Sequence, residues 1–65
     1  MFRLYYFFNP NSPSLIYSSD DLGPCLNFIE HNNYVHSKCT IVSPNNRKIT
    51  FNSNNELVFG SINNY

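Results

Sequence analysis

The chain opens with the stretch Phe2-Arg3-Leu4-Tyr5-Tyr6-Phe7-Phe8, in which residues that favour β-strands dominate. The next residues, Asn9-Pro10-Asn11-Ser12-Pro13, are typical of a strand end. We therefore predict a first strand whose even positions face the core and whose odd positions, Arg3, Tyr5 and Phe7, lie on the reverse face of the sheet. Because both faces are apolar, this strand should be central in the sheet or covered, since an exposed apolar edge invites aggregation.

A helix is predicted after Ser18-Ser19-Asp20-Asp21, a run of N-capping residue types, with Asp21 as the N-cap. Pro24 then occupies the first helical turn, where proline is tolerated. The residues at i, i+3, i+4 and i+7, which share one stripe that should face the sheet, are Leu22, Cys25, Leu26 and Ile29. The helix should end at Asn32-Asn33, because Asn can adopt the left-handed cap conformation. Phe28 lies off the stripe and is exposed unless a loop or a partner covers it.

Three further strands are predicted, over residues 34–42, 47–51 and 56–59, and Pro and Asn favour turns at 43–46 and 52–55. Alternation in the first of them places Val35, Cys39 and Ile41 on the core face, and Tyr34, His36, Lys38 and Thr40 on the reverse face. The apolar residues 15–17 are too few to predict a strand. The expected fold is α+β: a small two-layer sandwich in the order β-α-β-β-β, with one short helix packed on a mostly antiparallel four-stranded sheet.

Composition limits the classes of function. The 65 residues allow one small domain spanning 1–65, with an ordered core over about 2–59 and a loose tail over 60–65, and they exclude a multi-domain enzyme. Four basic and four acidic side chains give zero formal net charge, so there is no long-range attraction for nucleic acid or an anionic membrane. Twelve Asn and no Ala are compatible with an AT-rich genome, as in a phage, an organelle or a low-GC bacterium. Since no apolar run approaches the roughly 20 residues that span a bilayer, we expect a cytoplasmic protein with reduced thiols and no membrane partner.

The chemically reactive side chains form no familiar motif. Cys25, His31, His36 and Cys39 are spaced C-x5-H-x4-H-x2-C, which matches none of the usual structural zinc patterns. A Cys25 nucleophile with His31 or His36 as base lacks an evident orienting group, and the two glycines form no phosphate-binding loop. We predict two buried thiols, no metal, no cofactor and no enzymatic activity.

The reverse face of the predicted sheet is the most informative feature. It gathers Arg3, Tyr5, Phe7, Tyr34, His36, Lys38, Lys48 and Val58. Such a face can form the aromatic centre of a protein interface, can stack the bases of a single-stranded nucleic acid, or can be covered by residues 15–17 or by a second copy of the chain. Zero net charge favours a protein partner. The predicted partner-binding residues are Arg3, Tyr5, Phe7, Phe28, Tyr34, His36 and Lys38.

We therefore expect a small non-enzymatic protein that binds another protein, as an inhibitor or an accessory subunit, for example a phage-encoded inhibitor of a host protein. The alternatives are a single-strand nucleic-acid binder that uses the sheet face and a structural homodimer that buries it.

Overall fold

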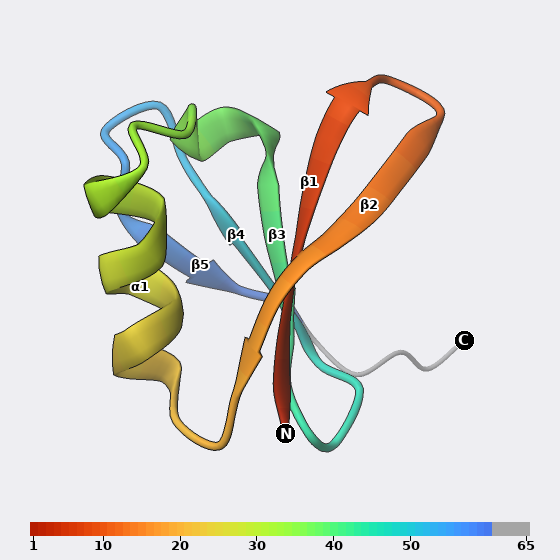
Figure 1. Ribbon diagram of the computed structural model, residues 1–65, viewed down its shortest axis with the longest axis vertical. Coiled ribbons are helices and arrows are strands. Elements are labelled where there is room, and N and C mark those ends of the chain that lie inside the picture. Colours follow the sequence, from red (N-terminus) through yellow and green to blue (C-terminus); the bar gives the residue numbers. More distant parts are fainter. Residues whose placement is uncertain (61–65) are drawn as a thin grey trace.

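The computed structural model describes residues 1–60 (Figure 1). Their elements, in chain order, are β1 (Phe2–Asn9), β2 (Ser12–Ser19), α1 (Leu22–His31), the 3-10 helix η1 (His36–Lys38), β3 (Cys39–Val42), β4 (Lys48–Phe51) and β5 (Leu57–Phe59). The strands form one sheet in the order β2-β1-β3-β4-β5, and every pair of neighbours is antiparallel. The α+β class is confirmed, but the predicted order of elements and the predicted number of strands are wrong.

The additional strand is β2, which pairs with β1 as a hairpin. Its pattern was hidden by a β-bulge: Tyr17 pairs with Leu4 and Leu15 pairs with Tyr5, which leaves Ile16 as an extra residue. Ile16 and Tyr17 consequently both pack against the core. The bulge removes the alternation of period two by which a strand is recognised in sequence. The hairpin makes β1 internal to the sheet, as its two apolar faces predicted.

The helix begins and ends where the sequence predicts. Asp21 is the N-cap, with extended backbone angles (φ −122°, ψ 156°), although its side chain makes no capping hydrogen bond. At the other end Asn33 adopts the left-handed conformation (φ 56°). The N–H of Asn33 donates to the carbonyl of Glu30, and the N–H of Tyr34 donates to that of Ile29, which together form a Schellman motif.

This helix end overturns the predicted strand over residues 34–42. The Schellman hydrogen bond holds Tyr34 against the last helical turn, and its ring packs 4.7 Å from that of Tyr6 on the core side. Val35, predicted to face the core, is 49% exposed. Because η1 follows, the alternation of a strand begins only at Cys39.

The two predicted turns are confirmed and share one geometry. In each turn the carbonyl of the first residue, Ser43 or Asn52, accepts a hydrogen bond from the backbone N–H three residues later. The backbone N–H of the same residue donates to the carbonyl four residues later. Asn46 and Asn55 occupy the left-handed position before the next strand, with φ of 65° and 62°. Asn tolerates this conformation better than other residues with a Cβ atom, which explains its place in both turns.

The core lies between α1 and one face of the sheet. Its buried members are Leu4, Tyr6, Cys25, Ile29, Cys39, Ile41 and Ile49. The helix connects β2 to β3, and β1 lies between these two strands in the sheet. The connection therefore crosses over β1, and α1 packs against β1 and β2. Of the predicted loose tail, Gly60 continues the β4–β5 ladder, with its N–H donating to the carbonyl of Lys48 at 2.8 Å, and residues 61–65 lie outside the described part of the chain.

Candidate interaction surface

The sheet face opposite α1 is uncovered by other described elements. Side chains alternate along each strand, so the residues next to the buried Leu4, Ile41 and Ile49 point to the opposite face. Strand pairing extends this face across the sheet. We call it the open face, and its members are Arg3, Tyr5, Phe7, Pro13, Leu15, Ser18, Thr40, Val42, Lys48, Thr50 and Val58.

The open face has an apolar centre with cations at one end. Tyr5 is paired with Leu15 on one side and with Thr40 on the other. In the neighbouring row Val42 is paired with both Arg3 and Lys48, so the two cations flank one aliphatic side chain. Leu15 is 54% exposed, whereas Tyr5 is half-buried between its neighbours. The side chain of Tyr5 is therefore partly packed against its neighbours and partly accessible to solvent.

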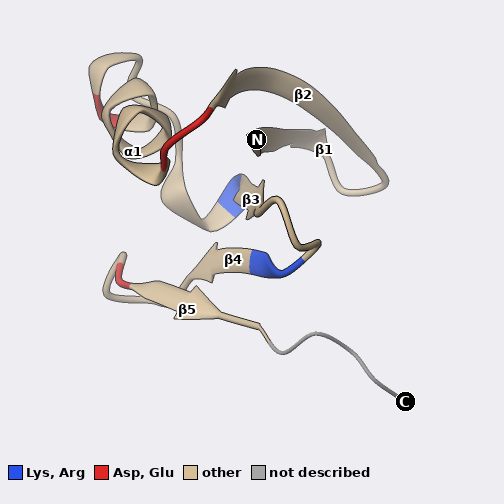
Figure 2. Ribbon diagram, turned by 90° about the horizontal axis from the view of Figure 1, so that it is seen from below, with Lys and Arg blue, Asp and Glu red and all other residues tan. Residues whose placement is uncertain are grey.

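Charge is segregated between this face and the rest of the described chain. The open face has two cations and no acidic residue. Figure 2 shows the acidic residues in the β2–α1 connection, on α1 and in the β4–β5 turn; they are Asp20, Asp21, Glu30 and Glu56. A molecule of zero net charge thus presents a positively charged sheet face.

Three of the predicted partner-binding residues, Arg3, Tyr5 and Phe7, lie together on the open face. Tyr34 and His36 do not: the Tyr34 ring packs on Tyr6, and the His36 ring lies 5.0 Å from that of Phe51, which alternation places on the core side. The grouping of all these side chains on one face is therefore wrong, because residues 34–38 form a cap and a 3-10 turn and no strand.

Phe28 is separate from the open face and is half-buried. The ring of Tyr17, in β2, stacks on the Phe28 ring with centroids 4.5 Å apart. Phe28 was expected to be exposed unless another segment covered it, and β2 provides that cover. Leu15, in contrast, is an exposed member of the open face that sequence reasoning missed. Two apolar runs, 2–8 and 15–17, separated by the turn-forming residues 9–14 are a hairpin signal that could have identified it.

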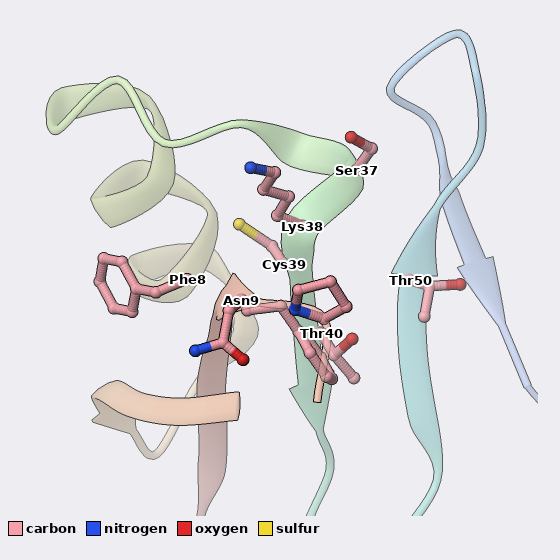
Figure 3. Close-up of a pocket in the computed structure, with 9 residues that line it drawn as sticks. Phe8, Asn9, Ser37, Lys38, Cys39, Thr40 and Thr50 are labelled. Atoms are coloured by element: carbon pink, nitrogen blue, oxygen red, sulfur yellow. The ribbon is translucent and has the colours of Figure 1, made fainter. Parts of the chain in front are cut away.

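Lys38 lies at the end of the open face, where a hollow of about 310 Å³ is lined also by Phe7, Thr40 and Thr50. Figure 3 shows that its polar groups do not converge, because the Lys38 ammonium group extends away from the Thr50 hydroxyl. A small ligand is normally oriented by polar groups directed at one point. The hollow is thus better suited to receive a side chain than to position a substrate.

The thiols are buried in the core. Burial raises the pKa of Cys25, and it raises the pKa of Cys39 to about 11, so both groups are protonated at neutral pH. The Cys39 thiol donates a hydrogen bond to the carbonyl of Val35. The prediction of buried thiols is confirmed for both cysteines, and neither has the low pKa of a reactive nucleophile. Among residues 1–60, no three His, Cys, Asp or Glu side chains lie close enough together to hold a metal ion.

Comparison of the chain with protein-family models, curated proteins and solved structures gave no match. Within the described part of the chain no helix has the length and apolar character needed to cross a bilayer.

Proposed function

We propose that the protein acts by binding another protein through the open face, as an inhibitor or an accessory subunit. The carrying observation is that this sheet face combines an apolar, aromatic centre around Tyr5 and Leu15 with two cations and no helix above it. Solvated faces of antiparallel sheets are usually polar, whereas Tyr, Phe and Arg are enriched at protein interfaces. A tyrosine side chain has only two rotatable χ angles, so it loses little conformational entropy when a partner covers it.

Two observations favour a protein over a single-stranded nucleic acid. A stacking platform needs several accessible rings along the strand, and with Tyr34 and His36 on the core side the open face retains only Tyr5 and Phe7. The face also offers two cations, Arg3 and Lys48, to a polymer whose binding depends on neutralising many phosphates. An apolar centre with a few charges around it matches the apolar core and polar rim of a protein interface better than it matches a nucleic-acid site.

The same charges oppose a homodimer through this face. Two copies that bury their open faces against each other would bring two positively charged surfaces together, with no acidic residue on either face to compensate. Like charges across an interface weaken association. A partner with acidic side chains around an apolar patch avoids this cost.

The test begins with capture of partners by the tagged full-length chain, followed by titration calorimetry with the purified partner. Tyr5→Ala and Leu15→Ser should each weaken binding by about 2 kcal/mol, since side chains at the centre of an interface dominate its energy. Asn27→Ala, on the exposed side of α1, is the matched control and should bind as the wild type does. Circular dichroism verifies that each variant is folded.

Ionic strength separates the alternatives. A protein interface centred on aromatic groups should weaken only slightly as salt increases, whereas binding to an oligonucleotide weakens steeply. Tight, steeply salt-dependent binding of a single-stranded oligonucleotide that Tyr5→Ala abolishes would replace this proposal with the nucleic-acid function. A stable dimer in light scattering that Leu15→Ser dissociates would replace it with the homodimer.

A further inference from the structure

Among residues 1–60, nothing forms a second layer over one end of the helix-bearing face of the sheet. The packing of α1 is on β1 and β2, and η1 covers the end of β4 where His36 meets Phe51. Figure 2 shows α1 beside the β2 end of the sheet, with β4 and β5 at the opposite end of the row of strands. Phe59, which alternation places on this helix-bearing face through its pairing with Ile49, is 54% exposed.

The uncovered end forms a groove of about 430 Å³. Its apolar lining comes from Phe2 at the start of β1, Leu22 in the first turn of α1, Ile49 of β4 and Phe59 of β5. Arg47, in the β3–β4 turn, is the only charged residue among the described residues that line it. The β3–β4 turn lines the other side with Ser43, Pro44 and Asn45 as well as Arg47. The groove is thus apolar on the side of α1 and the strands, and polar with one cation on the side of this turn.

We propose that this groove binds the apolar face of an acidic amphipathic helix from another protein. Neighbouring strands lie about 5 Å apart, so the axes of β3, β4 and β5 span about 10 Å, which matches the diameter of a helix lying on them. A helix there would complete the layer that α1 begins, with apolar side chains one turn apart against Leu22 and Phe59. Arg47 would pair with a carboxylate at the edge of that helix, where a guanidinium can form two hydrogen bonds.

Two other occupants fit less well. Within residues 1–60, a second copy of the chain has no free helix to offer. The apolar stripe of α1 is already packed on its own sheet, and the outer positions of α1, Asn27, Glu30 and His31, are polar. An added β-strand would find only the three residues of β5 at this edge. The groove lies on the face opposite the open face, so this site is separate from the proposed function and both sites can be occupied at once.

The probe for this site is a fluorescently labelled synthetic helix of about 20 residues, because isolated helices shorter than about 15 residues are marginal in water. It carries Leu at i, i+3, i+4 and i+7 and Glu at the remaining exposed positions. A matched peptide carries Lys in place of Glu, and a third has the same composition as the first with the Leu spacing scrambled. Fluorescence anisotropy with the full-length chain should show the acidic helix binding about tenfold or more tightly than either control peptide.

Adjacent residues on opposite faces provide matched variants. Phe59→Ser should weaken binding of the acidic helix about tenfold, and Arg47→Glu should make the chain prefer the Lys peptide. Val58→Ser and Lys48→Glu change the neighbouring residues, whose side chains lie on the open face, and should leave binding of the acidic helix unchanged. The altered side chains are exposed, and circular dichroism verifies that the variants are folded.

Three results would overturn the proposal. The first is the absence of binding by the acidic helix. The second is equal binding of the acidic and scrambled peptides, since that would show no recognition of a helical apolar face. The third is loss of binding in Val58→Ser or Lys48→Glu to the same extent as in Phe59→Ser, because it would place the contact on the open face.

Discussion

The rings of Tyr17 and Phe28 are stacked, with centroids 4.5 Å apart and planes inclined by 14°. This contact joins the edge strand β2 to α1. Phe28 also lies 5.9 Å from Tyr34, whose ring is 4.7 Å from that of Tyr6, so aromatic contacts run from the edge of the sheet to the buried centre. The strand that was missing from the sequence prediction thus supplies the cover for the one aromatic residue that the predicted helix left exposed.

The stack should contribute measurably to stability. We expect Phe28→Ala to lower the free energy of unfolding by about 2 kcal/mol, because it removes a half-buried ring at a contact between helix and strand. A double-mutant cycle with Tyr17→Ala should give a coupling energy of about 1 kcal/mol, typical of an aromatic pair. Urea denaturation measures both quantities. Strict additivity of the two substitutions would show that the rings do not interact.

The left-handed asparagines of the two strand-connecting turns should be sensitive to replacement by alanine. Asn46→Ala and Asn55→Ala should each destabilise the protein by about 1 kcal/mol, because Ala adopts positive φ reluctantly. Gly at either position should be tolerated. Asn54→Ala, in the same turn as Asn55 but without positive φ, should change the free energy of unfolding by less than about 0.5 kcal/mol. Destabilisation by Gly as large as that by Ala would mean that the side chain, and not the backbone conformation, is needed.

The buried thiols give a pH dependence of defined sign. The pKa of Cys39 is about 11 in the folded chain and near 9.0 when solvated, so the unfolded chain loses this proton first. The contribution of the neutral thiol to stability is fully present below pH 9 and is lost as the pH rises toward 11. Urea titrations across this range should show a decline that is smaller in Cys39→Ala.

The same burial protects the thiols from reagents. A chromogenic aromatic disulfide at neutral pH should modify neither Cys25 nor Cys39 in the folded chain and both of them after unfolding. Rapid modification of the folded wild type would contradict the burial of these thiols. The two single Cys→Ala variants would then show which thiol reacts.

Sequence reasoning succeeded where local rules act alone. Asp21 and Asn33 mark the two ends of α1 as predicted, because helix ends depend on a few neighbouring residues. The stripe from Leu22 to Ile29 identifies the packed face, because helical periodicity is also local. The odd positions of β1 were placed on the correct face of the sheet for the same reason. The position of Arg3, Tyr5 and Phe7 on the open face was therefore predicted from the sequence, and their role in binding stays a prediction.

It failed where a contact between distant residues overrides the local pattern. Residues 34–38 alternate like a strand, but the Schellman hydrogen bond from Tyr34 to Ile29 and the packing of its ring on Tyr6 turn them into a cap and a 3-10 helix. That packing decides which side chains share the open face, and it removes Tyr34 and His36 from it.

The sequence by itself therefore determined the α+β class, the helix with its packed stripe, the burial of both cysteines and the positions of the turns, since each follows from residue types at short spacing. Only the tertiary structure decided that β2 exists and that Leu15 joins Tyr5 on the open face. Ile16, the extra residue at the bulge, packs against a core whose members come from strands and a helix far along the chain, and no local pattern contains that interaction. The uncovered groove beside Phe59 is likewise a property of the fold, because it depends on how far one ten-residue helix reaches across a five-stranded sheet.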